Sequence, residues 1–198
     1  MVIYQQSAGA PGRHKRVTIP NYITIFRFLL VPAVILALLS DDNVWALICF
    51  VVAGVSDGID GFIARHFNQR SKLGAYLDPV ADKLLLVSVF LVLGFMSELP
   101  LWLVVLVVSR DALIICAVLL SSVMARPVEV KPLLVSKANT AVQIVLVTVV
   151  LTELALEQAF GDTRSLLVIA SGLLTAASAA AYLVQWLRHM GPDDTPGR

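Results

Sequence analysis

Four aspartates occur at spacings that suit metal chemistry. Asp57 and Asp60 are three residues apart, and Asp78 and Asp82 are four apart. In a helix these spacings place side chains on one face. If two helices meet at the loop near Arg70, four carboxylates converge at the mouth of a helix pair. One or two hard divalent cations would relieve their mutual repulsion, because Mg²⁺ and similar ions take oxygen ligands and bridge phosphates.

Two glycines in the same stretch, Gly61 and Gly74, carry no side chain where a ligand or a neighbouring backbone could approach closely. The alternative for the aspartates is a polar loop in which the carboxylates are solvated or salt-bridged. Asp57 and Asp82 directly adjoin apolar runs, however. We therefore favour the metal site.

The elements that position these residues are predicted to be membrane helices. Hydrophobic residues make up 58% of the chain and the mean hydropathy is +0.84, well above an ordinary soluble domain. Each apolar run is close to the ~20 residues needed to cross a bilayer. The runs are 23–39, 44–63, 75–96, 101–123, 136–154 and 166–187. We predict an all-α integral membrane protein with six transmembrane helices.

The two ends of the chain are predicted to lie outside this membrane domain. Residues 1–17 are polar and finish in a basic cluster, which is typical of a flexible cytoplasmic tail that attracts anionic lipid. A signal peptide is not expected, because the following apolar run is long and lacks a small-residue cleavage site. The membrane domain is predicted over 18–188, and 189–198 form a short polar tail.

Charge predicts the orientation of the helices. Acidic residues dominate three alternate connections, and the opposite side collects most of the basic residues. These are Arg13, Lys15, Arg16, Arg65, Arg70, Lys72, Arg126, Lys131, Lys137 and Arg188. By the positive-inside rule, both termini and the aspartate cluster face the cytoplasm, at the inner membrane if the source is bacterial. A substrate that is half lipid and half pyrophosphate suits a carboxylate cluster at that membrane edge.

The whole stretch resembles a known family. Its spacing, D-x2-D-G-x2-A-R-x8-G-x3-D-x3-D, matches the signature of the CDP-alcohol phosphatidyltransferases at every position. The matching residues are Asp57, Asp60, Gly61, Ala64, Arg65, Gly74, Asp78 and Asp82. The resemblance implies an enzyme that uses Mg²⁺ or Mn²⁺, with two ions at its site. It also implies CDP-diacylglycerol as donor, attack by an acceptor hydroxyl on the lipid-proximal phosphorus, and CMP as leaving group.

The resemblance also implies a role for each aspartate. Asp57, Asp60 and Asp78 are the principal metal ligands, and Asp82 completes the site. Asp82 is in addition the expected general base, since a carboxylate beside the metal can take a hydroxyl proton.

Four further motif positions are implied to hold the donor. Gly61, Ala64 and Gly74 would leave space for the nucleotide, and Arg65 would contact the pyrophosphate. The alternative for Arg65 is a side chain that extends to the membrane interface without contacting a ligand.

A second polar set bears on the acceptor. Charges inside a membrane span are costly and usually face a polar cavity or a partner. Arg110 and Asp111 are adjacent in the fourth run, so we expect them to project in different directions and not to pair. We favour an anion pocket; the alternative is an Arg110 that pairs with a motif aspartate. Arg27 is a weaker member, since a snorkelling side chain would explain it equally well. The predicted acceptor-binding residues are Arg110, Lys131, Lys137 and Asn139.

The identity of the acceptor follows in part from this charge. Several cations favour an acceptor that carries phosphate, which leaves glycerol 3-phosphate or phosphatidylglycerol. Segments 109–111 and 131–143 resemble the cardiolipin synthase branch of the family more than the phosphatidylglycerophosphate synthase branch. The resemblance implies phosphatidylglycerol as acceptor, giving cardiolipin and CMP. The alternative is a phosphatidylglycerophosphate synthase that uses glycerol 3-phosphate.

Two other classes of protein fit the sequence less well. An ion or proton carrier also places carboxylates in membrane spans, but its charges would follow a path through the bilayer, whereas here they collect on one side. A scaffold has no need for convergent aspartates. No nucleic-acid partner is expected. A homodimer is expected from the small residues of the sixth run and from the family's habit. Cys49 and Cys116 lie in apolar runs and are expected to be small buried free thiols.

Overall fold

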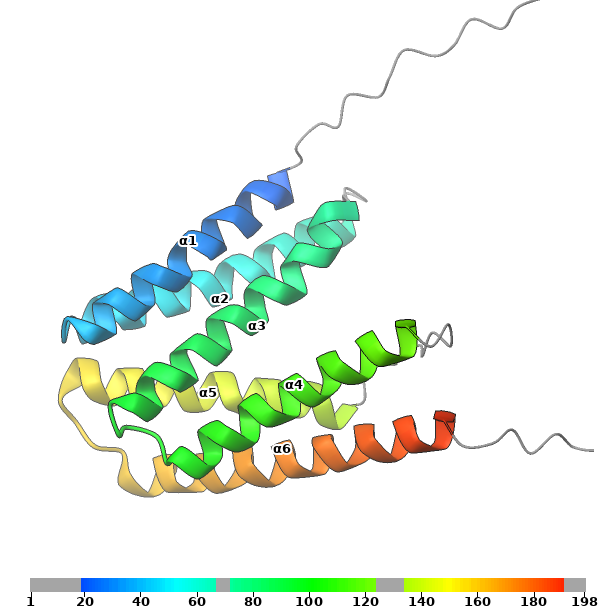
Figure 1. The fold of residues 1–198 in the computed structure, drawn as a ribbon. Coiled ribbons are helices and arrows are strands. Elements are labelled where there is room, and N and C mark those ends of the chain that lie inside the picture. Colours follow the sequence, from blue (N-terminus) through cyan, green and yellow to red (C-terminus); the bar gives the residue numbers. More distant parts are fainter. Residues whose placement is uncertain (1–18, 67–71, 124–133, 191–198) are drawn as a thin grey trace, which may run out of the picture.

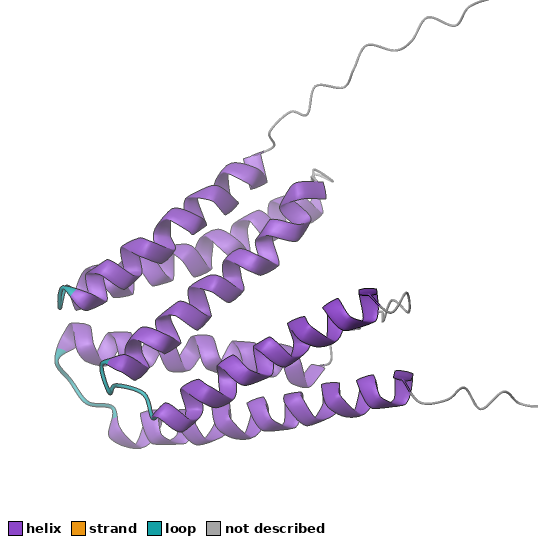
Figure 2. Cartoon of the chain, viewed as in Figure 1, coloured by secondary structure: helices purple, strands orange, loops and turns teal. Residues whose placement is uncertain are grey.

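The computed structural model of the chain is an α-helical bundle (Figures 1 and 2). The structure describes residues 19–66, 72–123 and 134–190, without the side chains of 19–24, 59–66, 72–80, 117–123, 186 and 188–190. No strand occurs among these described residues. The helices are α1 Ile19–Leu39, α2 Asn43–His66, α3 Lys72–Phe95, α4 Leu101–Val123, α5 Leu134–Leu156 and α6 Gly161–Met190.

The six helices confirm the six predicted runs, with differences at their ends. α4 begins and ends at the predicted residues, whereas α3 begins at Lys72 and not at 75. α6 extends over Gly161–Met190, beyond the apolar run 166–187. Both differences have one cause: polar residues at a helix end continue the backbone hydrogen bonding beyond the apolar segment that the sequence pattern detects.

The bundle consists of two groups of helices. α1 packs against α2 and α3, while α6 packs against α4 and α5. The groups are joined through contacts of α2 and α3 with α5, and of α3 with α4. Successive helices alternate in direction, so the start of α1 and the end of α6 lie at the same end of the bundle (Figure 1).

Three helices finish at the opposite end of the bundle with the same turn. Asp41, Ser97 and Glu157 have positive φ angles of 59°, 64° and 53° and follow α1, α3 and α5. In each turn the next amide donates to a carbonyl five residues back, as Asp42 N does to Ala37 O at 2.9 Å. This is the Schellman arrangement that satisfies the last carbonyls of a helix. It ends each helix sharply and turns the chain back along the bundle.

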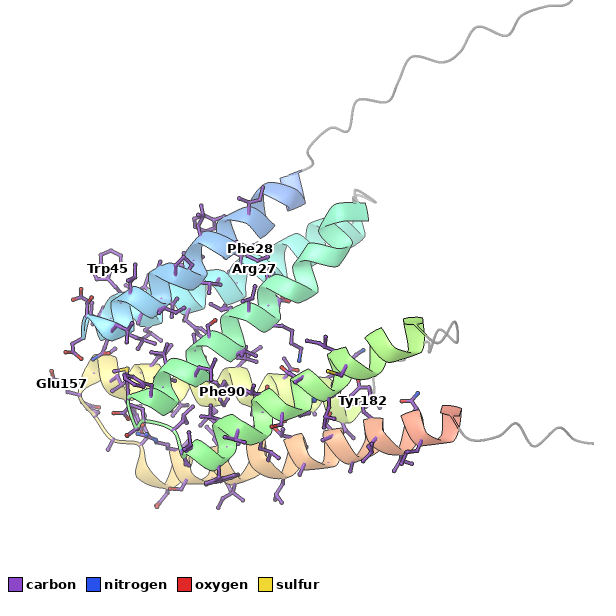
Figure 3. All side chains as sticks on the ribbon, viewed as in Figure 1. Arg27, Phe28, Trp45, Phe90, Glu157 and Tyr182 are labelled. Carbon is purple, nitrogen blue, oxygen red and sulfur yellow. The ribbon has the colours of Figure 1, made fainter. Side chains whose placement is uncertain are left out.

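Apolar side chains and small residues fill the contacts between helices. Ala46 and Ala53 on α2 and Ala81 on α3 are fully buried. Large buried residues such as Phe90 on α3 complete the packing (Figure 3). Small residues let helix backbones approach closely, and in lipid this close packing stabilises helix pairs.

The outer surface of the bundle is apolar on every helix. Large hydrophobic side chains are exposed on α1 to α6 in turn, including Leu29, Trp45, Phe95, Leu101, Leu134 and Leu173. Soluble monomers rarely expose apolar surface on this scale. Among the described residues, Leu134–Leu156 and Gly161–Gln185 are long and apolar enough to cross a membrane, while Ile25–Leu39 and Asn43–Gly58 are shorter apolar helices. The surface is consistent with a protein embedded in lipid.

The expectation for the cysteines is wrong in part. Both are free, but Cys49 is half-buried and Cys116 is exposed. Cys116 lies on α4 beside Ile115, which is also exposed. An apolar run in the sequence does not distinguish a side chain that faces lipid from one that packs inside the bundle.

The contact between α3 and α4 yields a prediction about stability. A Cβ atom at Gly94 would lie 2.8 Å from Cγ2 of Val104, a buried β-branched residue with little freedom to move. We expect Gly94→Ala to lower the free energy of unfolding by about 1–3 kcal/mol through overpacking. Thermal or denaturant unfolding of detergent-solubilised protein measures this.

Gly54→Ala is the matched control for this prediction. Gly54 also lies within a helix, but a Cβ atom there meets nothing within 4 Å. This variant should be as stable as the parent or more stable, because alanine favours helix. Equal stability of both variants would contradict the prediction.

Candidate active site

Two aspartates of the sequence motif meet at one arginine. The Nη2 atom of Arg27 on α1 lies 2.9 Å from Oδ1 of Asp57 on α2. Its Nη1 atom donates to Oδ1 of Asp82 on α3 at 2.5 Å. Figure 3 labels Arg27 on α1, within the group of helices that also contains α2 and α3. The planar guanidinium, with donors fixed in a fork, suits two carboxylates that come from two different helices.

Burial divides this arrangement into an inner and an outer part. The Arg27 side chain is completely buried, whereas Asp57 and Asp82 are 45% and 44% exposed. The arginine therefore supports the carboxylates from within the bundle and leaves them accessible to a ligand.

The structure decides between the interpretations of Arg27. A snorkelling arginine would place its guanidinium at the membrane interface, and the buried guanidinium shows that this interpretation is wrong. Its contacts with Asp57 and Asp82 join it to carboxylates on α2 and α3. In the sequence, Arg27 stands out as a charged residue within an apolar run. This pattern does not identify its partners, because they lie far from it in the sequence.

A second polar cluster is centred on Arg110, which is 2% exposed in α4. Its guanidinium donates to Ser178 Oγ on α6 at 2.8 Å and 3.2 Å, and to Ser136 Oγ on α5. It also lies over the ring of Tyr182, 5.7 Å from the centroid. This one side chain connects α4 with both other helices of its group.

The expectation that Arg110 and Asp111 do not pair is wrong. Nη1 of Arg110 lies 2.6 Å from Oδ1 of Asp111. The two residues do leave the helix in different directions, but the long arginine side chain turns back to the neighbouring carboxylate. The partner of Arg110 is thus Asp111 and not the motif aspartates among the described side chains, which are Asp57 and Asp82.

Lys83 is a polar residue for which no role was predicted from the sequence. Its Nζ atom lies 2.5 Å from Oδ1 of Asp111, so this carboxylate accepts from Lys83 on α3 and from Arg110 on α4. The Lys83 side chain is 42% exposed, whereas Asp111 is buried. Lys83 directly follows Asp82, so the pair connects the motif helix with the Arg110 cluster. The sequence feature that could have identified Lys83 is its position next to the motif aspartate Asp82.

The remaining predicted acceptor residues occupy different environments. Lys137 on α5 is exposed, and Lys131 lies outside the described residues. Asn139 is fully buried between α5 and α6, where its Oδ1 atom accepts from Thr175 Oγ1 at 2.8 Å. Gln143 Nε2 donates to the same Thr175 oxygen at 3.2 Å. The Asn139 Nδ2 group is buried without a hydrogen-bond partner in the described part of the chain.

A third charged cluster stabilises the opposite end of the bundle. Arg164 on α6 contacts the carboxylate of Glu153 on α5 at 2.9 Å and that of Glu98, between α3 and α4, at 3.0 Å. Glu153 is buried and also accepts from the amide of Phe160 at 2.6 Å. These contacts tie the α3–α4 connection to the α5–α6 connection.

A family model described as CDP-alcohol phosphatidyltransferase matches residues 17–186, most of the chain. The chain belongs to the CDP-alcohol phosphatidyltransferase family. The match covers all six helices apart from the last residues of α6. It confirms the family predicted from the spacing of the motif.

Several curated relatives are named cardiolipin synthase (CMP-forming). The rat protein is 35% identical over 181 residues, which cover 83% of this chain and 60% of the relative. The Streptomyces coelicolor protein is 37% identical over 107 residues, covering 51% and 50%. In Schizosaccharomyces pombe, a "Cardiolipin synthase (CMP-forming) / mitochondrial hydrolase fusion protein" is 33% identical over 189 residues, covering 88% and 32%. The chain thus spans at most 60% of the length of these relatives.

The other residues of the family motif lie on the same two helices as Asp57 and Asp82. Asp60, Gly61, Ala64 and Arg65 belong to α2, and Gly74 and Asp78 belong to α3, but their side chains lie outside the described residues. Asp60 follows Asp57, and Asp78 precedes Asp82, by about one helical turn. Convergence of all four carboxylates remains a prediction. Among the side chains that are described, no group of three His, Cys, Asp or Glu residues is placed to hold a metal ion.

Mg²⁺ or Mn²⁺ fits the part of the motif that the structure describes. Asp57 and Asp82 come from different helices and reach the same guanidinium, so their carboxylates lie close together. Both are half-exposed, and both offer the hard oxygen atoms that these ions prefer. The positive charge that Arg27 supplies to them is what a bound cation would also supply.

Proposed function

We propose that this protein is a metal-dependent phosphatidyltransferase that transfers the phosphatidyl group of CDP-diacylglycerol to a hydroxyl of phosphatidylglycerol. The products are cardiolipin and CMP. The observation that carries the proposal is the meeting of Asp57 and Asp82, from both halves of the family motif, at one site between helices. Membership of the family supports the reaction, and the names of the curated relatives support the acceptor.

Asp57, Asp60, Asp78 and Asp82 are the proposed ligands of two ions, Mg²⁺ or Mn²⁺. Bound at these carboxylates, the ions would stabilise the charge on the attacking and leaving oxygens of an in-line displacement. The four side chains act as a unit, because each supplies anionic oxygen to a shared site. The helical spacing of each pair supports this assignment.

Asp82 is the proposed general base. The acceptor hydroxyl oxygen forms a bond to the lipid-proximal phosphorus, the bond from that phosphorus to the CMP oxygen breaks, and the hydroxyl proton passes to the Asp82 carboxylate. Oδ1 of Asp82 already accepts a hydrogen bond from Arg27.

The donor is proposed to lie along α2 and the start of α3. Gly61, Ala64 and Gly74 offer little or no side chain, which favours close approach of a nucleotide. Arg65 is the proposed partner of the pyrophosphate, because a guanidinium pairs well with phosphate oxygens. These assignments rest on the family motif.

The acceptor phosphate is proposed to bind beside the Arg110 cluster. Lys137 is exposed there, and the Asn139 amide retains an unused donor. Lys131 is a further proposed cation for the acceptor phosphate, from the segment 131–143 that resembles the cardiolipin synthase branch. Arg110 is committed to Asp111, Ser136 and Ser178, so it shapes this region and adds positive charge from inside the bundle. A phosphodiester with one negative charge suits this modest number of available cations.

We place the protein in the membrane with six spans and with both termini and the site on the cytoplasmic side. The alternation of helix directions and the acidic turns at the opposite end support this orientation. The apolar outer surface supports the lipid environment. A homodimer is also proposed, supported by exposed small residues of α6 such as Ala176, Ala177 and Ala180.

The acceptor can be tested directly with purified protein. Labelled CDP-diacylglycerol and Mn²⁺ are offered with phosphatidylglycerol or with glycerol 3-phosphate in separate reactions. We expect labelled cardiolipin and CMP with phosphatidylglycerol, because a monoanionic lipid enters from the bilayer and needs only modest cationic pairing. Glycerol 3-phosphate carries more charge, enters from water and should leave the donor largely unreacted. Chromatography of the lipid products measures both outcomes.

The outcomes of this assay separate the alternatives. Consumption of glycerol 3-phosphate alone would assign the chain to phosphatidylglycerophosphate synthesis and leave the metal site in place. If neither acceptor supports CMP release by protein that binds Mn²⁺, the proposed transferase activity is contradicted. Metal or proton flux in proteoliposomes would then indicate the carrier.

A further inference from the structure

Arg27 is unusual among the charged residues of this protein in its depth and its partners. Its side chain is completely buried, yet it contacts two carboxylates that are half-exposed. It comes from α1, which carries no residue of the family motif. The motif helices α2 and α3 therefore receive a positive charge from a third helix, at the place where the metal ligands are proposed.

The charge balance of the site explains what this arginine does. Two carboxylates held together in a bundle repel each other strongly unless a cation lies between them. The Arg27 guanidinium supplies such a cation at 2.5 Å and 2.9 Å. When a divalent ion binds the same carboxylates, the arginine and the ion become like charges a few ångströms apart, and they repel.

We infer that Arg27 is the internal counter-ion of the metal site. It holds Asp57 and Asp82 together while the site lacks metal, and it weakens metal binding because it competes for the same carboxylates. The inference rests on the metal site of the proposed function and adds a positioning residue to it. An ion bound against this internal positive charge exchanges with solution more readily than one bound to unopposed aspartates.

A purely structural role predicts a different result. If Arg27 only joined α1 to α2 and α3, its loss would loosen the carboxylates and leave metal binding weaker or unchanged. If it is a counter-ion, its loss removes a competing charge and metal binding becomes tighter. The direction of the change in affinity therefore distinguishes the two roles.

The test is a Mn²⁺ titration of the purified full-length protein in detergent, with free Mn²⁺ followed by electron paramagnetic resonance. We expect Arg27→Gln to lower the Kd for Mn²⁺ by at least about tenfold, since removal of a full charge this close is worth more than a factor of ten. Arg27→Lys keeps the charge, and its Kd should stay within about threefold of the parent. An unchanged or raised Kd in Arg27→Gln would overturn the inference.

Arg164→Gln is the matched control. Arg164 also joins three parts of the chain through two carboxylates, but it lies at the opposite end of the bundle. Its loss should lower thermal stability and leave the Kd for Mn²⁺ unchanged. An equal gain in affinity here would contradict a specific role of Arg27.

Two further outcomes keep the test decisive. If Arg27→Gln does not survive purification without metal, purification with Mn²⁺ should rescue it, because the ion replaces the missing charge. Failure at every Mn²⁺ concentration would contradict the inference. If the parent protein itself shows no saturable Mn²⁺ binding, the proposed metal site fails, which is distinct from an unchanged Kd in the variant.

Discussion

Replacing Asp57 by Asn is expected to lower the rate of CMP release from CDP-diacylglycerol by about a thousandfold or more. The amide keeps the shape of the side chain but removes its negative charge and one hard anionic oxygen from the proposed metal site. Asp57 is half-exposed, so its exchange for Asn causes no steric clash, although buried Arg27 then keeps only the Asp82 carboxylate of its two described partners. Initial rates at saturating Mn²⁺, together with size-exclusion chromatography and thermal unfolding, measure activity and folding separately.

Asp162→Asn is the matched control for this prediction. Asp162 is an exposed carboxylate in the first turn of α6, at the opposite end of the bundle. Its loss should leave the rate within about twofold, since it lies far from the proposed chemistry. Treatment of the parent enzyme with a chelator should reduce its rate as far as Asp57→Asn does. More than a few per cent of activity in Asp57→Asn would remove Asp57 from the set of ligands.

The helices themselves could be predicted from the sequence because each depends on local information. Continuous apolar runs of suitable length predict six helices, and the described residues form six. The spacing of Asp57 and Asp82 within their motif was enough to predict that α2 and α3 bring motif carboxylates together. Both described members of the motif do meet at one site.

The partners of the buried charges could not be predicted, because they depend on how distant helices pack. Arg27 is separated from Asp82 by 55 positions, and Arg110 from Ser178 by 68. No local pattern contains either pair. Cys116 shows the same limit, since an apolar residue in a membrane helix can face lipid or neighbouring helices with equal ease. The orientation of each helix about its axis is the missing information.

The adjacent pair in α4 shows a different limit. Residues next to each other on a helix point about 100° apart, so Arg110 and Asp111 were expected not to pair. That rule describes only the directions in which the Cα–Cβ bonds leave the helix. A guanidinium lies several bonds from its backbone, and in a buried site it turns toward the carboxylate that it needs for compensation.

Replacement of Arg110 should show how much this charge compensation contributes to the stability of the fold. We expect Arg110→Gln to lower the free energy of unfolding by about 3–5 kcal/mol, as for other buried ion pairs that lose one partner. The Asp111 carboxylate would keep Lys83 but lose its buried cation, and Ser136 and Ser178 would lose a charged donor. Denaturant unfolding in detergent measures the change. The double variant Arg110→Gln with Asp111→Asn should be less destabilised, because it removes both charges.

Lys137→Gln is the comparison that separates stability from acceptor binding. Lys137 is exposed on α5, so its loss should leave the unfolding free energy within about 0.5 kcal/mol. The same change should raise the KM for phosphatidylglycerol, because it removes an available cation from the proposed acceptor region. An Arg110→Gln protein as stable as the parent, with only a raised KM, would show that Arg110 binds the acceptor and that its contacts with Asp111, Ser136 and Ser178 contribute little to the fold.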